Sequence, residues 1–193
     1  MKATTTLLSP REDTFLAPER SSWYNFSMYQ LPHHEGNLVR TWNGYLYRER
    51  NSLSACEEIV ESILAELRST DHGLFGTELC GGTIADKKPA DTAFYWRQGV
   101  LLIRFTLLVP ASLSDVRKVY EEDAVKINHH WQKVAKHLNG TYTNYTEADL
   151  TGVEAWQTTY GGNLERLVAL KQRLDPRNVF NYPHSLPVYL PNQ

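Results

Sequence analysis

Arg104 and Glu78 are charged side chains within stretches that are otherwise typical of β-strands, which makes them the first candidates for chemistry in this chain. In residues 100–108 successive side chains point to opposite faces, as in any strand. One face is wholly apolar, whereas the other mixes Arg104 and Thr106 with leucine and valine. Such a mixture is typical of a pocket or an interface rather than of a solvated surface. Alternatively, Arg104 pairs with an acid at a sheet edge and only stabilises the fold.

Two neighbouring stretches place further polar groups on one face. Alternation in residues 38–47 brings Tyr45 and Tyr47 together, and alternation in residues 74–80 adds Glu78. Phenol, carboxylate and guanidinium groups can bind a small molecule, polarise a carbonyl group or exchange a proton with it. The predicted site residues on this face of the sheet are Tyr45, Tyr47, Glu78, Arg104 and Thr106.

Motifs for nucleotide, metal or nucleophilic chemistry do not occur in the sequence. It has no GxGxxG or GxxxxGK[ST] loop for phosphates, no GxSxG elbow and no HExxH helix. The histidine pairs at 33–34 and 129–130 are adjacent, whereas two metal ligands on one helix face need a spacing of three or four. We therefore expect no metal site, and we interpret Cys56 and Cys80 as two buried small hydrophobic residues.

Hydrophobic periodicity predicts strands and amphipathic helices. The predicted strands are 23–29, 38–47, 73–85 and 100–109. One predicted helix begins at residue 54, and two others span 114–138 and 164–174. Because strands and helices do not alternate as βαβ units, this order predicts an α+β fold, with an antiparallel sheet and helices packed on one face. The predicted core face of the last strand consists of Leu101, Ile103, Phe105 and Leu107.

The length and the net charge of the chain limit the classes of protein to which it can belong. The chain has 193 residues, is 41% hydrophobic and has a formal net charge of −2 at pH 7. These values suit one globular domain with an appended segment, and they give no basic footprint for nucleic acid or a membrane surface. The N-terminal apolar stretch ends at Ser9 and is too short for a signal peptide. We therefore expect a cytoplasmic protein in which the sequons at Asn25, Asn139 and Asn144 are unused.

A long, ordered motif occupies the C-terminal part of the chain. Residues 142–150 (YTNYTEADL) are followed by 160–167 (YGGNLERL), 175–180 (DPRNVF) and 183–186 (PHSL). Their order and spacing resemble the C-terminal signature of the berberine bridge enzyme-like flavin oxidases. Upstream, residues 81–97 (GGTIADKKPADTAFYWR) are similar to the substrate-domain stretch of the same family.

This resemblance implies an antiparallel substrate-domain sheet backed by helices. It also implies that Tyr142 and Tyr145 line the active site as a base or as the partner of a base, and that Asn144 touches the cofactor. A tyrosine needs a lowered pKa to act as a base near neutral pH, and a cation such as Arg97 or Arg104 could provide it. The alternative is a structural hairpin whose hydroxyl groups cap backbone groups.

The departures from the family pattern concern the cofactor. The family carries its flavin on an N-terminal domain that holds the pyrophosphate loop, and this sequence has no such stretch. The family's acidic residue is displaced to Glu147 or Asp149, and His184 stands where glutamine is usual. We therefore expect no cofactor, with FAD as the alternative. The expected organisation is an irregular segment 1–20, a sheet and helix domain 21–140 and a segment 141–193 packed on that domain.

Three functions are compatible with these features. The first, which we favour here, is a stand-alone, flavin-free protein that binds a hydrophobic natural-product intermediate and promotes its cyclisation. Such a cyclase would promote a pericyclic reaction of the Diels–Alder type by positioning the substrate and forming hydrogen bonds with it. The second is the C-terminal part of an FAD-dependent oxidoreductase. The third is a non-catalytic binding subunit that forms a homodimer through the open face of the sheet.

Overall fold

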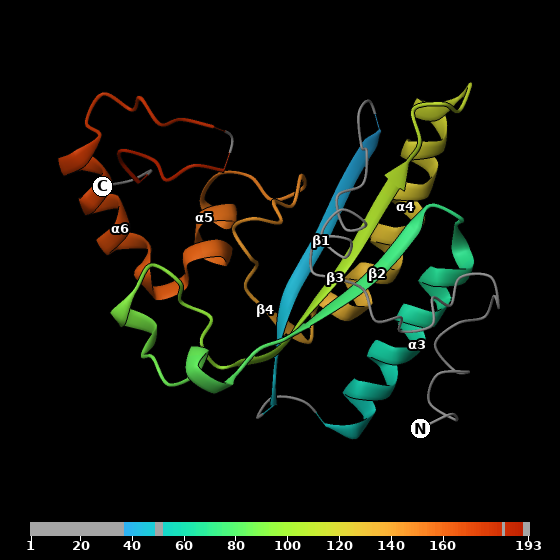
Figure 1. The fold of residues 1–193 in the computed structure, drawn as a ribbon, viewed down its shortest axis with the longest axis horizontal. Helices are drawn as coiled ribbons and strands as arrows, with labels where there is room; N and C mark the ends of the chain where they lie inside the picture. Colours follow the sequence, from blue (N-terminus) through green and yellow to red (C-terminus); the bar gives the residue numbers. More distant parts are fainter. Residues whose placement is uncertain (1–36, 49–51, 183, 191–193) are drawn as a thin grey trace, which may run out of the picture. The chain divides into compact units, whose positions relative to one another are not determined.

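The longest strands, β1 (Leu38–Tyr47) and β3 (Gly99–Val109), pair in antiparallel fashion in the middle of a four-stranded sheet. The sheet has the order β2-β3-β1-β4, with β2 (Gly73–Leu79) and β4 (Leu138–Asn139) at its edges (Figure 1). Every pairing is antiparallel, which confirms the predicted fold class. The computed structural model describes residues 37–48, 52–182 and 184–190. The predicted strand at 23–29 and the segment 1–20 lie outside these residues.

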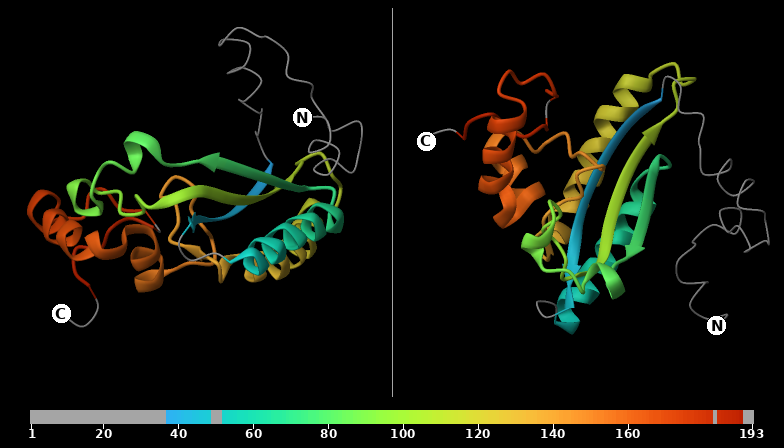
Figure 2. Two further views of the ribbon diagram at one scale, coloured as in Figure 1. Left: turned by 90° about the horizontal axis from the view of Figure 1, so that it is seen from below. Right: turned by 60° about the vertical axis from the view of Figure 1, so that its left-hand side comes forward.

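Two helices, α3 (Leu53–Ser69) and α4 (Val116–Ala135), cover one face of the sheet (Figure 2). The alternation in β3 decides which face they cover, because its apolar positions pack against the helices. The predicted core side chains Ile103, Phe105 and Leu107 are at most 1% exposed, and Leu101 packs against them. The other members of this core include Trp42, Ile59, Ile127, Trp131 and Val134.

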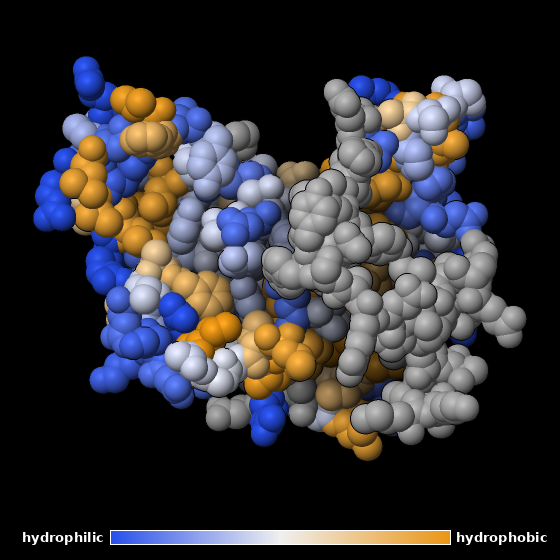
Figure 3. Space-filling model, in the orientation of Figure 1, coloured by the Kyte–Doolittle hydropathy of each residue, from blue (hydrophilic) through white to orange (hydrophobic). Residues whose placement is uncertain are grey.

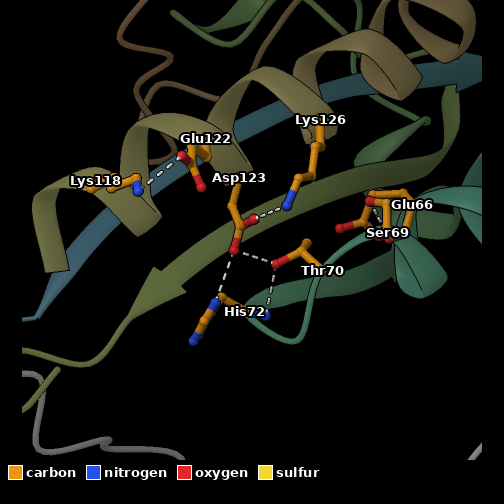
Figure 4. A network of polar contacts seen from close by, with 8 residues as sticks. All are labelled: Glu66, Ser69, Thr70, His72, Lys118, Glu122, Asp123 and Lys126. Atoms are coloured by element: carbon orange, nitrogen blue, oxygen red, sulfur yellow. Dashed lines mark hydrogen bonds and ion pairs between the residues drawn. The ribbon is translucent and has the colours of Figure 1, made fainter. Parts of the chain in front are cut away.

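A polar network ties the start of β2 to α4 (Figure 4). The Asp123 carboxylate accepts hydrogen bonds from the Thr70 hydroxyl and from Lys126 Nζ at 2.7 Å, and it lies 2.8 Å from His72 Nδ1. These donors hold the pKa of Asp123 below its usual range although burial opposes them. Beside this network, the carboxyl group of Glu66 is 0% exposed, and neither of its oxygens has a hydrogen-bond partner in the described chain.

The C-terminal part adds two helices, α5 (Gly152–Tyr160) and α6 (Leu164–Leu174), which lie against the segment between β2 and β3 (Figure 1). The Trp96 indole in that segment donates to the carbonyl of Thr159 at 3.0 Å. The amide of Asn163, which is 4% exposed, donates to the carbonyl of Pro89 at 2.7 Å. Buried bonds of this kind fix the segment between β2 and β3 on the C-terminal helices.

Several predicted boundaries are corrected by the structure. The strand expected over 73–85 ends at Leu79, and a 3-10 turn follows at Gly82–Ile84. The helix expected over 114–138 is shorter, because Leu138 leaves it to pair with Leu46 of β1. Helix α5 has no counterpart among the predicted helices. The two cysteines are free and half-buried rather than buried.

Candidate functional site

A cavity of about 450 Å³ lies on the side of the sheet that faces away from α3 and α4. Tyr45, Glu78 and Leu102 form its floor, and the strand register places Leu102 between the other two. Its walls come from the segment between β2 and β3 and from residues 141–143. The apolar residues of the lining are Leu79, Ile84, Ala93, Phe94 and Leu102. In Figure 3 apolar side chains gather on this face over the end of β2 and the segment that follows it.

Tyr145 and Glu78 meet at the edge of this cavity. The Tyr145 hydroxyl donates to Glu78 Oε1 at 2.7 Å, and Cζ of Arg104 lies 4.4 Å from the centroid of the tyrosine ring. The Tyr142 ring packs edge-on against the Tyr145 ring, with 5.4 Å between the centroids. Arg104 therefore stacks on a tyrosine, and no ion pair with an acid is found for it within the described residues.

The space for Arg104 is created by Gly76, which lies directly opposite it on β2. A Cβ atom at position 76 would lie only 3.1 Å from Arg104 Nη2, so any larger residue would displace the guanidinium group. The glycine thus permits a close approach of the backbone to a placed charge.

The pKa of Tyr145 is raised, which makes the expected lowering by a cation wrong. Burial is the largest cause, and the hydrogen bond donated to Glu78 also favours the protonated phenol, because a carboxylate accepts from the neutral form. Arg104 acts in the expected direction but is outweighed. At neutral pH Tyr145 is therefore a hydrogen-bond donor rather than a base.

Asn43 fixes the turn that carries both tyrosines, and it was not among the predicted site residues. Its side chain is 1% exposed, donates from Nδ2 to the carbonyl of Tyr145 and accepts at Oδ1 from the N–H of Tyr142, both at 2.7 Å. Asn144, at the exposed tip, donates to the Tyr142 hydroxyl at 2.9 Å. An amide on the pocket face of a buried strand was the signal that could have indicated this role.

Glu147, just beyond this turn, is a second buried acid, 8% exposed. Burial raises its pKa to about 7, and the neighbouring charge of Asp149 adds to the effect. The Trp131 side chain and the Asn43 backbone act in the opposite direction. Asp149 itself pairs with Arg40. Of the two positions proposed for the family's acidic residue, Glu147 is therefore the one inside the fold.

The remaining predicted site residues divide into two groups. Tyr45 and Arg97 line the cavity, but Arg97 bonds to the carbonyls of Phe94 and Ile84 rather than to either motif tyrosine. Tyr47 and Thr106 share the sheet face yet are not part of the lining, which corrects their assignment to it. Tyr145 and Asn144 line a neighbouring hollow of about 560 Å³ along β1, so the Tyr145–Glu78 bond stands between two hollows.

Comparisons with known proteins point to one family. Residues 141–187 match the family model described as "Berberine and berberine like". The chain is 27% identical over 144 residues to the chitooligosaccharide oxidase of Gibberella zeae, covering 70% of this chain and 28% of that protein. It is 31% identical over 108 residues to the FAD-linked oxidoreductase dpmaF of Metarhizium anisopliae, covering 53% and 20%. The chain is a relative of the berberine bridge enzyme-like oxidoreductases.

Solved structures of this family share the fold. The berberine bridge enzyme of Eschscholzia californica superposes with a TM-score of 0.65 at 19% identity, covering 78% of this chain and 33% of that one. A chitooligosaccharide oxidase gives a TM-score of 0.67 at 23% identity, covering 78% and 32%. The chain thus spans about a third or less of the berberine bridge enzyme-like proteins it matches. The predicted family resemblance is confirmed.

Several relatives are named FAD-linked oxidoreductases, which gives no support to the expectation of cofactor-free chemistry. The described residues do not fit a whole FAD. A dinucleotide pyrophosphate needs free backbone N–H groups or cations around it. Arg97 is the cation in the cavity lining, and its N–H groups already bond to two carbonyls and to the Thr92 hydroxyl. The cavity therefore suits a small molecule rather than the nucleotide part of FAD.

Two further findings concern metals and membranes. Among the residues that the structure describes, no three His, Cys, Asp or Glu side chains come together as a group that could hold a metal ion. No helix in the described ranges is both long and apolar enough to cross a membrane. A homodimer through the sheet face stays a prediction, which light scattering would test.

Proposed function

We propose that this chain supplies the substrate-binding part of an FAD-linked oxidoreductase. The observation that carries the proposal is the Glu78 carboxylate at an apolar cavity, held by a 2.7 Å hydrogen bond from Tyr145. The identity of the FAD-linked relatives supports the reaction class. FAD, when bound, would accept the electrons of the oxidation.

The chain's own residues would bind and orient the substrate. The apolar walls would bury most of an uncharged molecule, because such surface gains free energy on leaving water. Glu78 would accept the proton of a substrate hydroxyl group, since its carboxylate oxygens are acceptors only. Tyr145 would hold this carboxylate from the neighbouring hollow, and Arg104 would hold the tyrosine ring.

The chemistry of the lining favours an aromatic alcohol over an oligosaccharide. One relative is a monolignol oxidoreductase of Arabidopsis thaliana, and others are oxidases named for chitooligosaccharides and xylooligosaccharides. All of these substrates carry hydroxyl groups, but Phe94, Leu102 and Ile84 suit a ring better than a chain of sugars.

Titration calorimetry with coniferyl alcohol and with chitotetraose tests this proposal. We expect coniferyl alcohol to bind and the tetrasaccharide to bind much more weakly. Ala93→Trp would fill the cavity and abolish binding, whereas Ala169→Trp, at another exposed alanine outside the lining, would not. Binding that survives Ala93→Trp would contradict the assignment of the cavity.

Cyclisation without flavin is the second candidate, and one observation favours it. The cavity lining combines apolar walls with the phenol groups of Tyr45 and Tyr142, so a ligand could be held in one conformation beside hydrogen-bond donors. Tyr142 and Tyr45 would be the donors that polarise a carbonyl group.

An absorbance scan of the pure protein from 350 to 500 nm separates the two candidates. A flavin spectrum supports the oxidoreductase and counts against the cyclase. For the cyclase, unchanged cyclisation rates in both Tyr142→Phe and Tyr45→Phe would remove these residues from the mechanism.

A further inference from the structure

The floor of the cavity contains a phenol group, that of Tyr45. Tyr45 is 3% exposed and lines the cavity. Its ring packs edge-on against Phe94, with 5.6 Å between the centroids, and this contact holds the ring in the floor of the cavity. A ligand that fills the cavity and offers this hydroxyl no acceptor would remove its bonds to water without replacing them, which costs free energy.

The groups around this hydroxyl keep it in the donor form. Burial raises the pKa of Tyr45, and the neighbouring Cys80, Tyr142 and Glu78 act in the same direction. The phenol is therefore neutral throughout the physiological range and retains its hydrogen. Glu78 accepts the Tyr145 hydroxyl on Oε1, and no hydrogen bond between Glu78 and Tyr45 is found among the described residues.

Building on the proposed function, we propose that Tyr45 is a specificity-determining residue whose hydroxyl donates a hydrogen bond to an uncharged oxygen of the bound ligand. A hydroxyl, ether or carbonyl oxygen would satisfy the buried donor. A carboxylate would meet the like charge of Glu78, which disfavours it. The cavity therefore discriminates between ligands of one shape by the presence of an acceptor at the buried end, because a ligand without one leaves the donor unpaired.

Benzyl alcohol and toluene are a matched pair of probes, since they share the ring and differ in one oxygen. Both are titrated into the ¹⁵N-labelled full chain, and the dissociation constants are taken from amide shifts of the cavity residues. In Tyr45→Phe the preference for benzyl alcohol over toluene, given by the ratio of the two constants, should fall about tenfold relative to the wild type, because one hydrogen bond to the ligand is lost. Tyr120→Phe, on the helix side of the core, should leave the ratio unchanged.

The outcomes separate this inference from the proposed function. If both probes perturb the cavity and Tyr45→Phe leaves their ratio unchanged, the role of Tyr45 is overturned while the cavity stands. If neither probe perturbs the cavity residues of the folded wild type, both proposals are overturned. Tyr45→Met, judged folded by its amide spectrum, repeats the measurement should Tyr45→Phe fail to fold, and the same shift toward toluene is expected.

Discussion

Asn43 and Tyr145 lie 102 positions apart in the sequence, yet the side-chain amide of Asn43 donates to the Tyr145 carbonyl at 2.7 Å. The same side chain accepts the N–H of Tyr142. One buried residue on β1 thus positions both tyrosines of the C-terminal motif over the sheet. The motif has its geometry only because a strand far from it in sequence provides an amide at this place.

Removing this amide should destabilise the protein. Asn43→Ala leaves one N–H and one carbonyl unpaired, so we expect a loss of about 2–4 kcal/mol in the free energy of unfolding. Asn43→Asp keeps the acceptor for Tyr142 but places a carboxylate oxygen against the Tyr145 carbonyl, so it should also destabilise the protein. Urea unfolding measures both, and Asn128→Ala, which removes a helix-surface hydrogen bond with Gln132, is the control. An equal loss in Asn43→Ala and Asn128→Ala would contradict the role.

The pKa of Tyr145 should respond in opposite directions to its two neighbours. Glu78→Gln removes an acceptor and a negative charge, so the pKa should fall, whereas Arg104→Met should raise it further. NMR titration of ¹³Cζ-labelled tyrosine follows the signal. The exposed Glu165→Gln change should leave it unaffected, and a shift of the same sign in both neighbour variants would refute the arrangement.

Glu66 should make stability depend on pH. Burial raises its pKa from 4.5 to about 7 in the folded protein, so its contribution is fully present below pH 4.5 and is lost as the pH rises toward 7 and beyond. We expect the folded state to lose roughly 3 kcal/mol across this window. In Glu66→Gln about half of the slope should remain, because Glu147, whose pKa is also raised to about 7, contributes in the same window. Glu61→Gln, on the exposed side of the same helix, should keep the whole slope. Urea unfolding at a series of pH values measures the difference.

Alanine substitutions at two glycines with positive φ should separate the effect of backbone strain on stability from the effect of steric crowding. Gly161 (φ 51°) and Gly152 (φ 58°) both adopt the left-handed region, but a Cβ atom at 161 would collide with the Tyr95 ring and one at 152 would meet open space. Both alanine variants should lose about 1–2 kcal/mol through strain. Gly161→Ala should lose a further ~1–3 kcal/mol through overpacking. Equal losses in thermal or urea unfolding would show that Tyr95 does not hold this turn.

Much of the fold could be predicted from local patterns. The apolar alternation of β3 identified both faces of the sheet, because a period of two can bury only one set of side chains on the helices. The bounds of β1 and α6 also followed from periodicity and from the Asp175-Pro176 stop. Helix α5 was missed because it is short and its N-cap residue, Thr151, makes no side-chain cap.

The sequence by itself therefore determined the fold class, the pocket face with Tyr45, Glu78 and Arg104, and the family resemblance. Only the tertiary structure decided how these groups act. It placed the Tyr145 hydroxyl against Glu78 and partly buried the side chain. Burial and this hydrogen bond raise the pKa of Tyr145 by more than Arg104 lowers it, which reverses the expected direction of the shift. The physical reason is that desolvation and hydrogen bonding depend on which distant segments meet, and no local spacing specifies those meetings.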